Sequence, residues 1–260
     1  MAENRRKRHS NGPSKWARHG QNVHGPGIWA TCVKGKEKQT VGELYDLFDS
    51  LAEKLWPVAR GGVDDDEIPS DEEDVEKAFA KEIAIIKQPR KEKRFANCQT
   101  DTPCAIYISC KPPVDPVLLI QTHVQNVEKT GVTRTRSTHR LIPIADTCDV
   151  NAQDITSLCK RVVVPSFETE ETHVLRYKID LRIRNHNTLT REDIILTIAK
   201  CIPAHHKVDL VDPEMFILVE VFKSVCGMSV VRDYHRYKKF NVIEIAQSRN
   251  GETEGVPDKK

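Results

Sequence analysis

The sequence lacks the patterns that mark membrane proteins, secreted proteins and zinc proteins. No apolar run approaches the roughly 18–20 residues of a membrane-spanning helix, and no apolar segment follows the basic start as in a secretory signal. The eight cysteines contain no C-x-x-C pair, so zinc spacing is missing. We therefore expect reduced thiols and a cytosolic or nuclear protein.

Sequence motifs for cofactors and catalysis are also missing. There is no G-x-x-x-x-G-K-[ST] loop for ATP and no G-x-G-x-x-G turn for a dinucleotide. His205 and His206 have no third metal ligand at useful spacing, and Cys226 stands in an apolar strand as a core residue. These absences favour a binding protein without cofactor or metal.

The net charge of +2 conceals a strong local asymmetry. Residues 1–24 carry six Lys or Arg and one acid, whereas residues 64–76 carry nine acids and no Lys or Arg. The run Arg5–Arg8 has the makings of a nuclear-import signal or a non-specific RNA patch. We expect a nuclear protein, with the nucleolus and a cytoplasmic share also open.

The segment Val174–Arg184 alternates between apolar and charged residues. A period of two predicts a strand with one face in a core and the other toward solvent. The charged positions are Arg176, Lys178, Asp180, Arg182 and Arg184. Upstream, Arg134, Arg136 and Arg140 also share one parity. Clustered Arg on two strands indicates a surface for RNA phosphates, although each segment alone also fits an ordinary solvated strand face.

Glu220 interrupts the otherwise apolar strand Met215–Phe222. This near-continuous apolar run predicts a central strand that is covered on both faces. We expect Glu220 to pair with an Arg of the basic cluster; the alternative is an edge position that faces water.

Element signals predict an α+β fold with two units. In the first, strands over 28–33, 94–100, 104–110 and 134–142 alternate with helices over 40–56, 75–87 and 116–130. Thr40 with Glu43 has the spacing of a capping box, and Asp115 with Pro116 opens the last of these helices. This order suggests a ferredoxin-like domain. The second unit has helices over 152–163 and 190–202, the latter capped by Thr190, and strands over 174–184, 215–222 and 225–231.

Five blocks in the second half carry a family resemblance: Thr133–Pro143, Arg184-Asn185 with Arg191-Glu192, Lys207–Leu210, Val219–Lys223 and Val225–Tyr234. Their combination resembles the stand-alone THUMP proteins typified by the fungal tRNA acetylation factor Tan1 and THUMP domain-containing protein 1. The expected organisation is a disordered basic tail (1–24), a ferredoxin-like domain (25–144) with an acidic linker (61–76), an α/β THUMP domain (145–246) and a disordered tail (247–260).

The resemblance implies a non-catalytic tRNA-binding adaptor. Proteins of this family are required for N4-acetylcytidine in the D-arm of serine and leucine tRNAs. They hold the tRNA for a separate RNA cytidine acetyltransferase of the Kre33/NAT type, which uses acetyl-CoA and ATP. The expected partners are thus tRNA and that enzyme, with no membrane and no small-molecule substrate. The alternatives are an RNA-modifying enzyme with an unrecognised active site, or an RNA chaperone in ribosome assembly.

The expected RNA-binding residues come from two sources. By matching position, the resemblance implies this role for Arg134, Arg136, His139, Arg140, Arg184, Asn185, Arg191 and Lys223. The charged face of the alternating strand adds Lys178 and Arg182. His139 beside Arg140 could also act as a general base, but a phosphate or base contact is the better interpretation.

Overall fold

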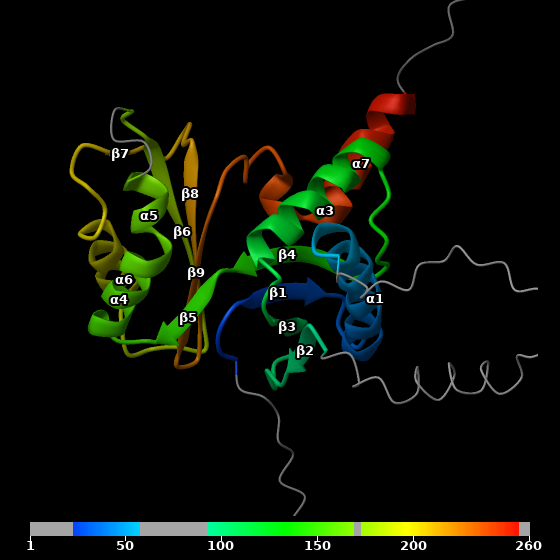
Figure 1. Cartoon of the computed structure of the whole chain (residues 1–260), viewed down its shortest axis with the longest axis horizontal. Helices are drawn as coiled ribbons and strands as arrows, with labels where there is room; N and C mark the ends of the chain where they lie inside the picture. The colour runs from blue at the N-terminus through cyan, green and yellow to red at the C-terminus, as the bar shows by residue number, and fades with distance from the viewer. Residues whose placement is uncertain (1–22, 58–92, 169–172, 255–260) are drawn as a thin grey trace, which may run out of the picture.

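The computed structural model describes residues 23–57, 93–168 and 173–254 and contains a four-stranded and a five-stranded sheet (Figure 1). The predicted helix over 75–87, the acidic linker and residues 1–22 of the N-terminal tail lie outside the described residues. The two sheets confirm the expected α+β class.

The first sheet has the ferredoxin-like topology. Its elements in chain order are β1 (Gly27–Cys32), α1 (Glu37–Leu55), β2 (Phe95–Cys98), β3 (Ala105–Cys110), α3 (Pro116–Thr130) and β4 (Thr138–Ile144). The strand order is β2-β3-β1-β4, and each neighbouring pair is antiparallel. Both helices pack on one face of the sheet, which leaves the other face directed toward the second sheet (Figure 1).

The second sheet mixes parallel and antiparallel pairs. Its elements are β5 (Asp146–Asp149), α4 (Ala152–Val162), α5 (Val164–Glu168), β6 (Arg176–Arg184), α6 (Arg191–Ala199), β7 (Lys207–Val208), β8 (Met215–Phe222) and β9 (Val225–Val231). The strand order is β5-β9-β8-β6-β7, with β6 parallel to both neighbours. All eight residues of the central strand β8 are buried, as the apolar run predicts.

Capping residues define two helices as predicted and one differently. Asp115 accepts from Val117 N at 2.8 Å, and Thr190 forms a capping box with Asp193. The Thr40 cap was wrong, because α1 begins at Glu37 and Thr40 donates to the Lys36 carbonyl from inside the first turn. Glu43 instead accepts from the backbone N of Arg136, at 2.9 Å. The Glu43 carboxylate is therefore bound by a residue far along the chain and does not complete a capping box.

Both ends of the described chain are more ordered than the composition suggests. Val23 is buried, and the Gly25 N–H donates to Thr147 Oγ1. At the other end, η1 (Lys238–Phe240) leads into α7 (Val242–Glu254), so the expected disordered tail from 247 was wrong as far as Glu254. Helix α7 packs beside α3 of the first unit (Figure 1), because Val242 and Ile245 are buried in that unit's core.

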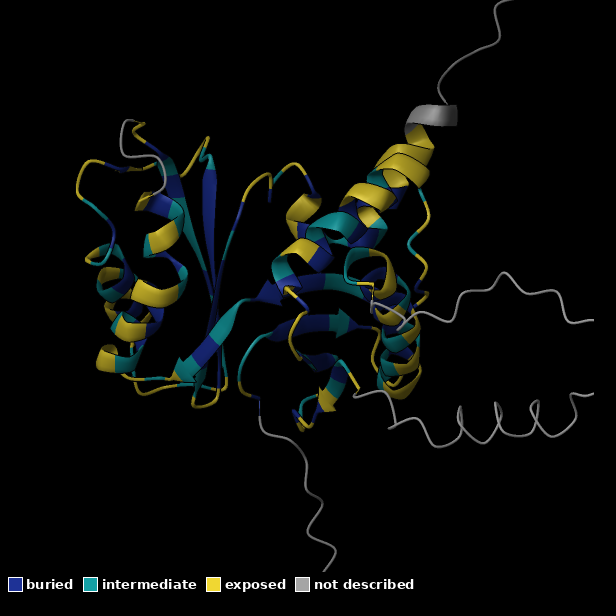
Figure 2. Cartoon of the chain, in the orientation of Figure 1, coloured by how far each residue is buried: buried dark blue, intermediate teal, exposed yellow. Residues whose placement is uncertain are grey.

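The two sheets share a core through β8. On one face of β8, Ile217, Val219 and Val221 pack with α4 and α6. On the other face, Phe216, Leu218 and Phe222 join the core of the first unit, and the Phe222 ring lies 4.9 Å from that of Trp29 in β1. Figure 2 shows buried residues both along β8 and β9 and along the strands of the first sheet. The second sheet is thus covered by helices on its outer face and by the first unit on its inner face.

Among residues 23–57, 93–168 and 173–254, no helix combines the length and the apolar character that crossing a bilayer requires. The same residues hold no group of three or more His, Cys, Asp or Glu placed to bind a metal ion.

Candidate nucleic-acid interface

The charged face of β6 is directed toward the first unit. In register with β8, Lys178 lies beside Phe216, Arg182 beside Glu220 and Arg184 beside Phe222. These β8 residues point away from α4 and α6, so the charged side chains of β6 share the inner face of the second sheet. Strand β6 is next to the edge strand β7 of this sheet.

Arg182 is held by three partners at this face. Its guanidinium donates to Tyr234 Oη at 3.1 Å and forms ion pairs with Asp180 at 3.6 Å and Glu220 at 3.7 Å. The pairing of Glu220 with an Arg is thereby confirmed, and the edge-position alternative is wrong. With its side chain 21% exposed and its donors engaged, Arg182 orders the inner face.

The Glu220 carboxyl group is unusual because it is buried on a central strand. Burial raises its pKa to about 7, while Arg184, Arg182 and Arg140 oppose this rise and Asp180 adds to it. Glu220 therefore changes charge near neutral pH beside three arginines.

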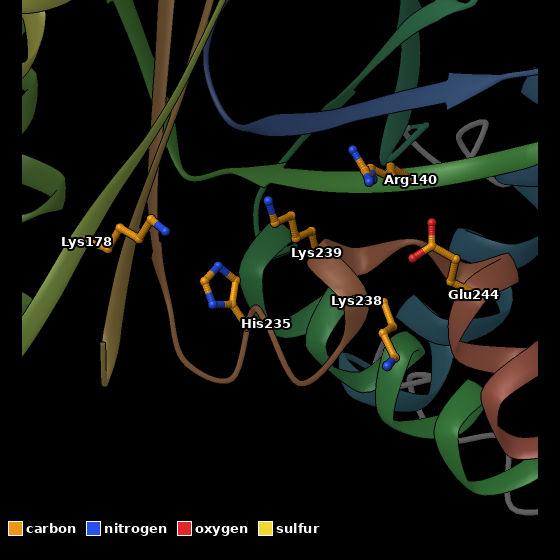
Figure 3. A pocket seen from close by; sticks show the side chains of 6 residues that line it. All are labelled: Arg140, Lys178, His235, Lys238, Lys239 and Glu244. Atoms are coloured by element: carbon orange, nitrogen blue, oxygen red, sulfur yellow. The ribbon is translucent and has the colours of Figure 1, made fainter. Parts of the chain in front are cut away.

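A pocket of about 390 Å³ opens where the two units meet (Figure 3). Arg140 enters it from β4 of the first sheet and Lys178 from β6 of the second. The segment after β9 completes the wall with His235, Lys238, Lys239 and Glu244. We call this the junction pocket.

The turn that carries the two lysines has an uncommon backbone. Three successive residues of this turn have φ values in the left-handed region, which residues other than glycine rarely adopt. The values are 49° at Lys238, 54° at Lys239 and 56° at Phe240. The turn is anchored by the fully buried Phe240 ring, and a backbone bridge joins Asn241 to Arg140. The core thus stabilises a costly conformation of the turn, which the bridge to Asn241 holds next to Arg140.

Burial affects two groups at the junction pocket. Arg140 Nε is buried and has no hydrogen-bond partner. The His235 ring packs edge-on against Phe216 at 4.5 Å, and burial, with Lys178 and Lys239 nearby, lowers its pKa against the opposing charge of Asp180.

Comparisons with known proteins match one domain of the chain and, for whole relatives, most of its length. The family model for the THUMP domain matches residues 150–231. An uncharacterised protein of Schizosaccharomyces pombe is 32% identical over 94% of this chain and 83% of its own length. THUMP domain-containing protein 1 of Mus musculus is 28% identical over 91% of this chain and 71% of its own. The tRNA acetyltransferase TAN1 of Saccharomyces cerevisiae is 28% identical over 86% of this chain and 85% of its own.

The chain belongs to the THUMP domain family. The matched residues run from the end of β5 through β9 and so cover most of the second sheet. Of the residues that line the junction pocket, only Lys178 lies within this THUMP match; Arg140 precedes it, and His235, Lys238, Lys239 and Glu244 follow it.

The predicted residues of the first unit separate into two places. Strand β4 begins at Thr138, so the expected strand from Arg134 was wrong, and Arg134 and Arg136 lie in the preceding loop. Arg134 donates to Ser50 of α1, away from the THUMP domain. Alternation along β4 places His139 on the opposite face of the strand from Arg140. Arg140 alone of these four lines the junction pocket.

Four of the residues predicted to bind RNA do not line the junction pocket and lie near the C-terminal end of β6 or at the start of α6. Asn185 and Lys223 occupy turns with positive φ, and Lys223 Nζ donates to the Thr100 carbonyl of the first unit. Arg184 is half-buried at the end of β6, near Glu220. Arg191 donates to the Leu181 carbonyl from the start of α6, on the helical side of the THUMP domain.

Sequence reasoning missed His235, Lys238, Lys239 and Glu244 as pocket residues. The pair Lys238-Lys239 was the available signal, but a left-handed turn without glycine gives no sequence cue. The junction pocket brings Arg140 of the first unit and Lys178 of the second to one concave surface, which is suited to binding phosphate groups.

Proposed function

We propose that this protein is a tRNA-binding adaptor that presents tRNA to a separate RNA cytidine acetyltransferase. The observation that carries the proposal is the junction pocket, which is lined by Arg140 and Lys178 from the two sheets and by Lys238 and Lys239. Lysine and arginine side chains that converge on a concave surface bind the nucleic-acid backbone independently of sequence. The relative TAN1, whose name is that of a tRNA acetyltransferase, supports tRNA as the RNA concerned.

In this proposal the acetyl transfer belongs to the partner enzyme of the Kre33/NAT type. The protein itself holds serine and leucine tRNAs so that a cytidine in the D-arm is presented for N4-acetylation. Support comes from the sequence, which has no nucleotide-binding loop for the ATP that such an enzyme uses. We further propose a nuclear location, on the basis of the basic run Arg5–Arg8, which lies outside the described residues.

Binding is tested with two double variants that remove the same charge from different places. Arg140→Gln with Lys178→Gln empties the junction pocket of two cations, whereas Arg134→Gln with Arg136→Gln alters the loop beside α1. The pocket variant is expected to bind tRNA more weakly and to lower the slope of log affinity against log salt by about 2, while the control changes both less. If the two double variants both stay folded and lose the same tRNA affinity, binding depends on overall positive charge and not on the junction pocket.

Catalysis is tested by incubating the purified protein with tRNA, acetyl-CoA and ATP, with and without the separate acetyltransferase. N4-acetylcytidine is expected only when both proteins are present. Acetylcytidine formed by this chain alone would instead assign it the activity that the name of TAN1 states for that relative.

A further inference from the structure

The junction pocket holds more positive charge than one phosphodiester can neutralise. Four cationic side chains line it, from Arg140, Lys178, Lys238 and Lys239. The one carboxylate, Glu244, accepts from Asn241 Nδ2 at the start of α7 and so serves the helix end. A phosphodiester brings one negative charge, whereas a terminal phosphomonoester brings about 1.5–2 at neutral pH.

Arg140 supplies a donor that needs an acceptor. Its Nε is buried without a hydrogen-bond partner, and leaving a buried donor unpaired is costly. Because Nε itself is not open to the pocket, a phosphate would meet the Arg140 guanidinium at its two terminal nitrogens, through two parallel hydrogen bonds. The backbone bridge to Asn241 keeps Arg140 next to the turn that carries Lys238 and Lys239. In Figure 3 Lys239 extends on the same side of this turn as Arg140, whereas Lys238 extends away from them, so Arg140 and Lys239 are the pair that one phosphate can bridge.

We propose that the junction pocket binds a terminal phosphomonoester of RNA, as at the 5′ end of a tRNA whose leader has been removed. This inference rests on the proposed function and adds to it the chemical group that the pocket selects. An endonucleolytic cleavage that leaves a 5′-phosphate must then supply the RNA that this protein prefers.

His235 makes the doubly charged phosphate the better fit. In the free protein, burial lowers the pKa of His235, with Lys178 and Lys239 acting in the same direction and Asp180 against them. Its other packed neighbours are the rings of Phe216 and Tyr234. A dianion in the pocket favours the imidazolium form, so binding of the phosphomonoester takes up a proton at His235.

The test compares one tRNA transcript in two forms, with a 5′-phosphate and with a 5′-hydroxyl, using the full chain. The wild-type protein is expected to bind the phosphorylated form about tenfold more tightly. Lys239→Gln removes most of this preference. The control Arg134→Gln, in the loop beside α1, preserves the preference even where it weakens both complexes.

The outcomes separate this inference from the proposed function. Failure of the wild-type protein to bind either form would overturn both. Equal binding of the two forms would overturn the inference alone, and a Lys239→Gln variant that weakens both forms equally would then assign the pocket to an internal phosphodiester.

A second measurement does not depend on RNA or on the folding of a variant. The titration midpoint of the His235 ring, followed by NMR in the wild-type protein, is expected to rise when inorganic phosphate is added. An unchanged midpoint at saturating phosphate would contradict a dianion site beside His235.

Discussion

The carboxyl group of Glu220 couples the stability of the central strand to pH. Its pKa in the folded protein is about 7, above its ordinary value of 4.5, so the folded state holds this proton more tightly than the unfolded state. Stability from this group is therefore full at acidic pH and is lost as pH rises from about 4.5 to 7.

Replacing Glu220 with Gln should remove this dependence. Between pH 4.5 and 8, the free energy of unfolding of the wild-type protein is expected to fall by about 3 kcal/mol relative to Glu220→Gln, since each pKa unit is worth about 1.4 kcal/mol. Urea unfolding of both proteins across this range measures the difference. Parallel curves would show that Glu220 ionises normally in the folded state.

Arg182 should act on stability through Glu220. Arg182→Met leaves Glu220 and Asp180 without their shared partner and is expected to cost about 3 kcal/mol at pH 8. In the double variant Arg182→Met with Glu220→Leu, an apolar pair replaces Arg182 and Glu220, and the part of this loss that comes from an unpaired Glu220 should be recovered, while Asp180 stays without its partner. Additive losses in urea unfolding would mean that the two side chains do not interact.

At the residue scale, the sequence predicted relationships between neighbours better than positions in loops. Strand alternation placed Lys178 and Arg182 on one face, and a lone acid on an apolar strand indicated its arginine partner. Arg134 and Arg136 were misplaced because parity has no meaning before the strand begins at Thr138. The backbone of Arg136 is instead held by Glu43, a contact with a sequence separation of 93.

At the scale of elements, the left-handed turn at η1 allows the backbone strain at Lys239 to be measured separately from the contribution of the Lys239 side chain to tRNA binding. Lys239→Gly suits a φ of 54° and removes one ammonium group from the junction pocket. Thermal unfolding is expected to show stability unchanged or raised by about 1 kcal/mol, while tRNA affinity falls. Lys239→Gln is the matched control, because it removes the charge but keeps the strain. A Gly variant that is less stable than the Gln variant would refute the strained turn.

Elements with their own capping residues were predictable, and elements that depend on a distant surface were not. Asp115 and Thr190 mark α3 and α6 by local chemistry. Helix α7 has buried apolar residues near its start, namely Val242, Ile245 and Ala246, and then turns polar. Its polar half resembles a tail in sequence, and only its position beside α3 shows that it belongs to the first unit.

At the scale of the whole molecule, the shared core predicts one unfolding transition. Trp29 of the first sheet contacts Phe222 of the second, and an added Cβ at Gly227 would lie 2.8 Å from Ile144. Helical circular dichroism and tryptophan fluorescence are therefore expected to give coincident urea curves. Two separated transitions would show that the units are independent despite this contact.

The construction of the junction pocket from both sheets has a thermodynamic consequence. A ligand held by Arg140 and Lys178 together binds only while the two units are docked, so its binding free energy is added to the docking equilibrium by linkage. By reciprocity, any change that loosens the contact between the two units also lowers the affinity of the pocket for its ligand. Gly227→Ala is such a change, because the added Cβ would meet Ile144, although Gly227 does not line the pocket. On the proposed function, RNA bound in the junction pocket would therefore strengthen the contact between the two units.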